Sequence, residues 1–144
     1  MVENDTVRLL RECDAGIRMG VDSINEVIGK VKGDSLRETL IRCREEHENL
    51  ADELRGMLDE YGDAGKKPNP VAKATSWIKT NVEMTFDRSD ETIAALMTDG
   101  CNMGVKSLSR YLNQYAAADE RSRSLCQRLI DLESNAAISM REEL

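Results

Sequence analysis

The chain has 144 residues, enough for one domain with a buried core, and its net charge is −7 at neutral pH. This charge argues against binding to nucleic acid or to an anionic membrane surface, because both partners require a basic face. Aromatic residues make up 3% of the chain, which favours helices over a β-sandwich or barrel. No apolar run approaches the roughly 20 residues that span a bilayer, and the start "MVENDTVRLL" lacks the order of a signal peptide. We therefore expect a cytoplasmic protein.

Four segments carry apolar residues at helical spacing, which predicts long helices over about residues 6–31, 35–61, 89–116 and 119–144. Gly33 is expected to follow the first helix with a left-handed backbone. Ser35 and Glu38 form a capping-box pattern at the start of the second helix. Asp119 is the best candidate cap for the last helix.

The segment "YGDAGKKPNP" contains two glycines and two prolines and is typical of a linker. Pro70 behind Asn69 is typical of a helix start, so a shorter helix carrying Trp77 is expected over about residues 70–86. Two helical hairpins joined by one long connection describe an all-α, antiparallel four-helix bundle, a single domain over residues 1–144. A three-helix arrangement with an arm is the structural alternative.

One polar or thiol side chain on each long helix lies at or near the apolar stripe. His47, the only histidine in the chain, falls in the middle of its stripe at 100° per residue. On the other three helices these positions belong to Asp14, Cys101 and Glu133. A buried carboxylate without a partner is costly, so these side chains need partners, water or a metal ion.

The phrases "ECDAGIRMG", "REEHENLADEL" and "TDGCNMGVKSLSRY" resemble those of a bacterial ferritin-like family that has no assigned function. The resemblance covers essentially the whole chain and implies a ferritin-like bundle. Di-iron proteins of that superfamily use one Glu on each of two helices and Glu-x-x-His on each of the other two. Matched to that pattern, the metal positions of this chain are Asp14, His47, Cys101 and Glu133.

Every element of the di-iron pattern is altered here. Asp14 and Cys101 stand where glutamates are required, and Arg44 stands three residues before His47 in place of a glutamate. Ala136 replaces the second histidine. A guanidinium stays charged and repels cations, although Arg44 could pair with a core carboxylate.

The heights of these residues along the bundle are a second test. In a hairpin that turns near Gly33, Asp14 and His47 are offset by five residues, about 7 Å at helical rise. In the other hairpin, Cys101 and Glu133 come level. Two half-sites are therefore easier to build than one complete site. We interpret His47 first as a core histidine bonded to a neighbouring side chain or water, and second as a metal ligand.

Small residues on the stripes, among them Gly20 and Gly104, predict close helix packing, with room for a ligand as the alternative. The four cysteines include no C-x-x-C pair. No two of them come level within a hairpin, and a disulfide needs Cα atoms within about 7 Å. We therefore predict four buried, reduced thiols, while bridges across the diagonals of the bundle stay open.

Two classes of function follow from this sequence. The first is a non-enzymatic structural or protein-interaction module that needs no cofactor and has a second copy or another protein as partner. The alternative is a protein that binds iron or manganese through Asp14, His47, Cys101 and Glu133, in oxidative stress or iron handling. A minor third option is a small apolar ligand in a bundle cavity. The incomplete ligand set favours the first class over an enzyme.

Overall fold

The computed structural model describes residues 4–62 and 89–144. These residues form four long helices and a final short 3-10 turn, namely α1 (Asn4–Ile28), α2 (Asp34–Glu60), α4 (Asp90–Gln114), α5 (Glu120–Ser139) and η1 (Arg141–Glu143). The first three predicted helices agree with this to within a few residues. The fourth was expected to continue to the end of the chain, but it stops at Ser139 and tightens into η1. The predicted Trp77 helix lies outside the described residues.

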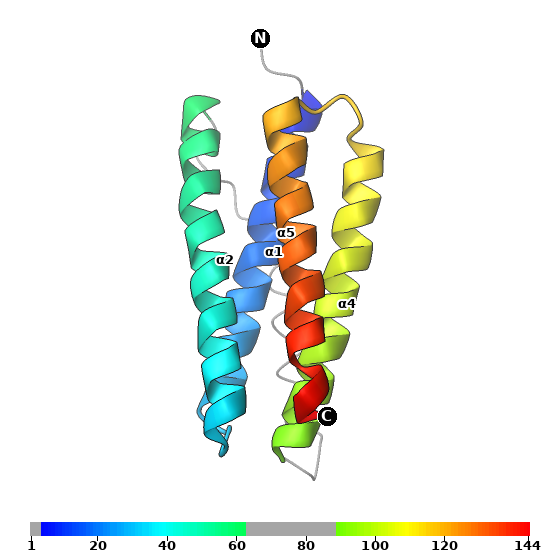
Figure 1. Ribbon diagram of the computed structural model, residues 1–144. Coiled ribbons are helices and arrows are strands. Elements are labelled where there is room, and N and C mark those ends of the chain that lie inside the picture. Colours follow the sequence, from blue (N-terminus) through cyan, green and yellow to red (C-terminus); the bar gives the residue numbers. More distant parts are fainter. Residues whose placement is uncertain (1–3, 63–88) are drawn as a thin grey trace.

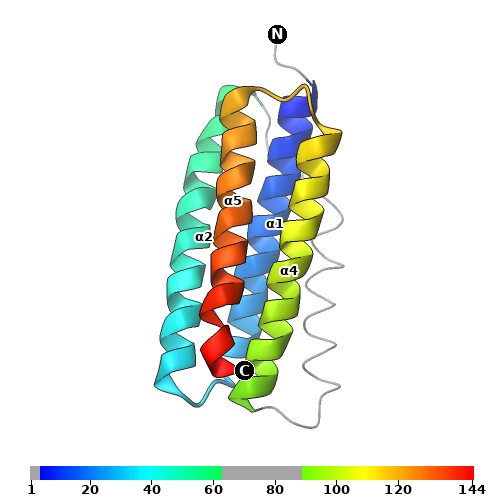
Figure 2. The same cartoon turned by 45° about the vertical axis from the view of Figure 1, so that its right-hand side comes forward.

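The helices form two antiparallel hairpins, α1 with α2 and α4 with α5 (Figure 1). α2 ends at one end of the bundle and α4 begins at the opposite end, so α2 and α4 run in the same direction, as do α1 and α5 (Figure 1). This topology is a four-helix bundle with a single crossover between the hairpins. The predicted all-α four-helix bundle is therefore confirmed (Figure 2).

The two parallel helices α1 and α5 face each other across a short diagonal, where their Cα atoms come within 8 Å. The backbone N–H of Asp119 donates to Thr6 Oγ1 at 2.8 Å, which joins the α4–α5 connection to the start of α1. Seven residues advance a helix by about 10.5 Å, so parallel helices stay level when both advance by seven. The level pairs are then Thr6 with Asp119, Cys13 with Cys126, Gly20 with Glu133, and Val27 with Met140.

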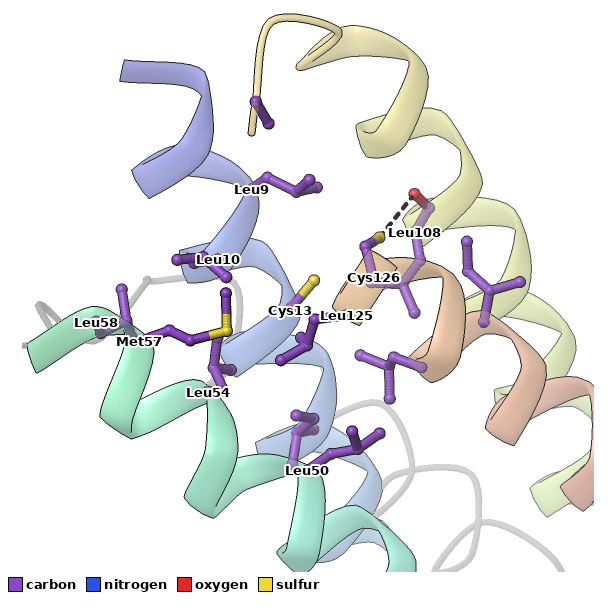
Figure 3. Packing of buried hydrophobic residues seen from close by; sticks show 14 residues of the cluster. Leu9, Leu10, Cys13, Leu50, Leu54, Met57, Leu58, Leu108, Leu125 and Cys126 are labelled. Carbon is purple, nitrogen blue, oxygen red and sulfur yellow. Dashed lines mark hydrogen bonds between the residues drawn. The ribbon is translucent and has the colours of Figure 1, made fainter. Parts of the chain in front are cut away.

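The buried apolar side chains form two clusters. The upper cluster, part of which is shown in Figure 3, includes Leu10, Ile17, Leu50, Leu108 and Leu129. The lower cluster includes Ile24, Leu40, Cys43, Met97 and Ala136. On each helix, the residue between the two clusters is polar or a glycine. Within the described ranges, none of the helices is long and apolar enough to cross a membrane.

Of the three predictions about helix ends, the cap at Asp119 is correct, and those for Ser35 and Gly33 are wrong. Asp119 caps α5 as predicted, because its side chain accepts from the N–H of Ser122 at 2.8 Å. The predicted capping box at Ser35 is wrong: α2 begins at Asp34, and the Ser35 hydroxyl donates to Glu143 Oε1 at 2.6 Å. The left-handed glycine is Gly62 after α2, with φ 69°.

Gly33 has an extended backbone, with φ −84°, so its predicted left-handed conformation is also wrong. Glycine is required at position 33 because the Asp90 carboxylate approaches its backbone closely. Gly33 N–H donates to Asp90 Oδ2 at 2.7 Å, and a Cβ at this position would lie 2.8 Å from that same oxygen. This contact ties the turn between α1 and α2 to the start of α4.

Replacing the cap of α5 tests this description of the helix ends. Asp119→Ala removes the acceptor for the Ser122 N–H and for the Tyr61 hydroxyl, which donates to Asp119 at 2.6 Å. We expect the free energy of unfolding in urea to fall by about 1 kcal/mol. Asp119→Asn keeps a capping oxygen and should lose much less. Equal losses in the two variants would contradict the capping role.

Candidate functional site

His47 on α2 and Glu133 on α5 meet in the middle of the bundle, between the two apolar clusters. His47 Nε2 lies 2.5 Å from Glu133 Oε1, and the two side chains are only 2% and 9% exposed. On the other side of the ring, Nδ1 lies 2.7 Å from the backbone carbonyl oxygen of Cys43. A carbonyl oxygen and a carboxylate are both acceptors. The ring therefore donates from both nitrogens, which makes it an imidazolium.

The ionisation of His47 agrees with this geometry. Burial favours the neutral ring, but the hydrogen bonds with Cys43 and Glu133 and the negative charge of Glu133 together outweigh it and raise the pKa of His47 to about 10. The ring is then positively charged at neutral pH. The pair with Glu133 is a buried ion pair in which each charge has its own partner.

The other two helices make room for this pair with glycine. A Cβ on Gly20 of α1 would lie 2.9 Å from His47 Nε2, which is closer than real Cβ atoms approach. A Cβ on Gly104 of α4 would lie 3.3 Å from Glu133 Oε2. Gly20, His47, Gly104 and Glu133 therefore form one layer with one residue from each helix, which we call the polar layer. The close packing predicted for these two glycines is confirmed against the side chains of His47 and Glu133. Both glycines also line the cavity next to the pair, so the alternative of room for a ligand stays open.

Two thiols lie beside the polar layer. Cys43 Sγ is 3.6 Å from His47 Nδ1, one turn away on the same helix. Burial, followed by the negative charge of Glu133, raises the pKa of Cys101, so this thiol stays protonated. Cys101 and Glu133 are therefore neighbours, as the hairpin geometry predicted. Cys43 was not predicted as part of this site, although its spacing of four residues from His47 was a usable signal.

The remaining predicted metal position, Asp14, is not part of this group. Its carboxylate is 3.2 Å from Arg18 Nε, one turn along the same helix. The predicted offset between Asp14 and His47 along the hairpin explains the separation. Arg44 Nη1 donates to Asn25 Oδ1 at 2.8 Å, so this contact takes the place of the alternative pairing with a core carboxylate.

The described side chains do not build the metal centre that the di-iron pattern suggests. Among residues 4–62 and 89–144, no group of three or more His, Cys, Asp or Glu side chains is arranged to hold a metal ion. The two nitrogens of His47 point at separate acceptors, and a protonated nitrogen has no lone pair for a metal. Metal binding at this position requires His47 to lose a proton and its bond to Glu133.

A cavity of about 260 Å³ adjoins the polar layer. The residues that line it on α1 and α4 include Gly16, Met97 and Gly100, and His47 and Glu133 also line it. The glycines of these two helices thus leave space next to the buried ion pair.

Comparison with known proteins supports the fold. No protein-family model matches the chain, and no curated protein sequence matches it. Among solved structures, it is similar to the crystal structure of a DUF305 fragment, a domain of unknown function, from Deinococcus radiodurans. The TM-score is 0.77 at 9% sequence identity, over 98% of this chain and 95% of that chain. At this identity the likeness concerns the four-helix fold alone.

A methyl group at position 20 should disturb the polar layer. Gly20→Ala places a Cβ against the His47 ring, so we expect the free energy of unfolding to fall by roughly 1–3 kcal/mol. Gly56→Ala is the matched control, because Gly56 is also within a helix and a Cβ there meets nothing within 4 Å. That control should gain up to about 1 kcal/mol from helix propensity. Equal gains in urea denaturation of both variants would contradict the contact.

The charge of His47 predicts how stability depends on pH. A histidine whose pKa is raised in the folded state contributes fully below its unfolded pKa, near 6.5, and the contribution is lost as pH rises toward about 10. We expect the wild-type free energy of unfolding to fall between these values relative to that of His47→Gln. Because His47 is the only histidine, its NMR ring signal reports the titration directly. A titration midpoint near 6.5 would overturn the ion pair.

Proposed function

We propose that this protein is a ferritin-like bundle that works without a metal centre, as a non-enzymatic structural or protein-interaction module in the cytoplasm. The observation that carries the proposal is the bond between His47 and Glu133. These two residues match positions that hold metal in ferritin-like proteins. Here one is a cation and the other an anion, and each satisfies the other.

The other predicted metal positions support the same conclusion. Asp14 is paired with Arg18, and Cys101 is held as a neutral thiol by burial. A di-metal centre needs several anionic or neutral-nitrogen ligands around one point. Once the ion pair forms, no uncompensated negative charge remains among these four residues to attract a cation.

The partner we propose is a second copy of this chain or another protein. The net charge of −7 favours a protein partner that presents basic side chains, and it disfavours nucleic acid. In this proposal the buried ion pair specifies how the helices pack, and the outer helix faces make the contact. Such a role for a buried polar pair is known in other helical assemblies.

A second candidate is an iron- or manganese-binding protein with atypical ligands. The observation that favours it is the position of Cys43 and Cys101 beside the His47–Glu133 pair, as two further donors at one level of the bundle. Binding there would release the protons of His47 and of the thiols, so metal affinity would increase with pH.

Metal titration separates the two candidates. Fe(II), Mn(II) and Zn(II) are added anaerobically to the wild type and to His47→Gln, and the bound metal is measured after dialysis. We expect both proteins to retain far less than one equivalent. Binding of about one or two equivalents to the wild type, lost in His47→Gln, would overturn the proposal. Circular dichroism of the variant shows whether it keeps its helices, so that unfolding is not mistaken for loss of a ligand.

A further inference from the structure

A second pair of thiols lies in the upper cluster, away from the polar layer. Cys13 on α1 and Cys126 on α5 are both 0% exposed, and Figure 3 shows them among the leucines of this cluster. The two thiols are neighbours, because each is the largest cause of the change in the other's pKa. Cys126 Sγ also lies 3.7 Å from the backbone carbonyl oxygen of Leu108.

The register of the two helices explains why these thiols meet. Cys13 follows Thr6 by seven residues, and Cys126 follows Asp119 by seven. The hydrogen bond from Asp119 N–H to Thr6 Oγ1 makes the two starting points level, and Ala117 N–H donates to Asp5 beside it at 3.1 Å. Some Cα atoms of α1 and α5 lie within 8 Å of one another, so the two helices run close enough for their side chains to meet. A disulfide needs its own two Cα atoms at about 4.4–6.8 Å.

We propose that Cys13 and Cys126 are a modification site, a latent disulfide that hydrogen peroxide closes between the first and the last helix of the bundle. The structure holds both thiols in the reduced form. The bridge would cross the short diagonal of the bundle, the arrangement that the sequence analysis left open.

The chemistry assigns different roles to the two thiols. The neighbouring Cys13 thiol lowers the pKa of Cys126 against the effect of burial, and the charge of Arg123 adds to this, while the pKa of Cys13 is raised. In the closed structure the Cys126 thiol is protonated and donates to the backbone carbonyl oxygen of Leu108. Of the two thiols, Cys126 has the lowered pKa and therefore loses its proton more readily. Its thiolate then attacks peroxide: an S–O bond forms, the O–O bond breaks, and the leaving hydroxide takes up a proton. Cys13 then loses its proton and attacks the sulfenic sulfur of Cys126. The S–O bond breaks and water leaves, so two thiols and one peroxide give one disulfide and two waters.

Cys101 provides an internal contrast. Cys101 lies next to the negative charge of Glu133, and its raised pKa keeps it a thiol, which is a poor nucleophile. Hydrogen peroxide is small and uncharged, and the Cys13–Cys126 layer lies about two turns from the start of α5. Because both thiols are 0% exposed in the closed bundle, the proposal requires a limited opening at this end, of the kind by which proteins open locally without global unfolding.

The reduced full-length protein, folded and free of reductant, is treated with hydrogen peroxide, and free thiols are then blocked in denaturant. We expect a mass loss of about 2 Da before blocking and two remaining thiols, those of Cys43 and Cys101. Peptide mapping should give one cross-linked peptide that joins Cys13 to Cys126. The urea midpoint should rise on oxidation, because the bridge restricts the unfolded chain, and it should return on reduction.

Matched variants test the assignment. A Cys43→Ala, Cys101→Ala double variant should still form the bridge at the wild-type rate. Cys13→Ala should instead leave Cys126 as a sulfenic or higher acid, detected as added oxygen. A bridge between other cysteines, four free thiols after peroxide treatment, or bridge formation only in denaturant would each overturn the proposal. Circular dichroism confirms that each variant is folded before oxidation.

Discussion

The ion pair between His47 and Glu133 is the constraint on which the centre of this bundle depends. Two charges buried between apolar clusters are stable only while each keeps its partner. The pair therefore limits the size of the side chain that α1 and α4 can carry at the same level, and both helices have a glycine there. Glycine in a helix interior is otherwise unfavourable, so Gly20 and Gly104 are explained by the pair and by little else in their surroundings.

The same pair separates two chemical environments for the four cysteines. Below it, Cys43 and Cys101 lie beside charged groups that they contact but do not neutralise. Above it, Cys13 and Cys126 contact one another within a leucine-rich cluster. The contrast follows from the seven-residue register between α1 and α5, which places the two thiols in one layer and Gly20 and Glu133 in the next. A slip of either helix would break both layers together.

Much of the fold was predictable from the chain because its signals are local. Apolar spacing located four helices, and the cap at Asp119 was correct, since a side chain three residues from its acceptor N–H depends on short-range geometry alone. The errors concern groups joined by distant contacts. Gly33 and Ser35 have the residue types of a helix stop and a helix start, but their actual partners, Asp90 and Glu143, come from α4 and from the chain end.

By itself, the sequence determined an all-α bundle and the inward position of His47, Cys101 and Glu133. It also determined that Asp14 is offset from that group. These features follow from the helical period and from counting residues back to the hairpin turn, so they need no knowledge of how the helices pack. Only the tertiary structure decided that His47 bonds Glu133, that Cys43 joins them, and that Cys13 faces Cys126. Each of these contacts crosses between helices or depends on a side-chain rotation. The contacts between helices and the side-chain rotations depend on how the four helices pack together, and the pattern along any one helix does not specify them.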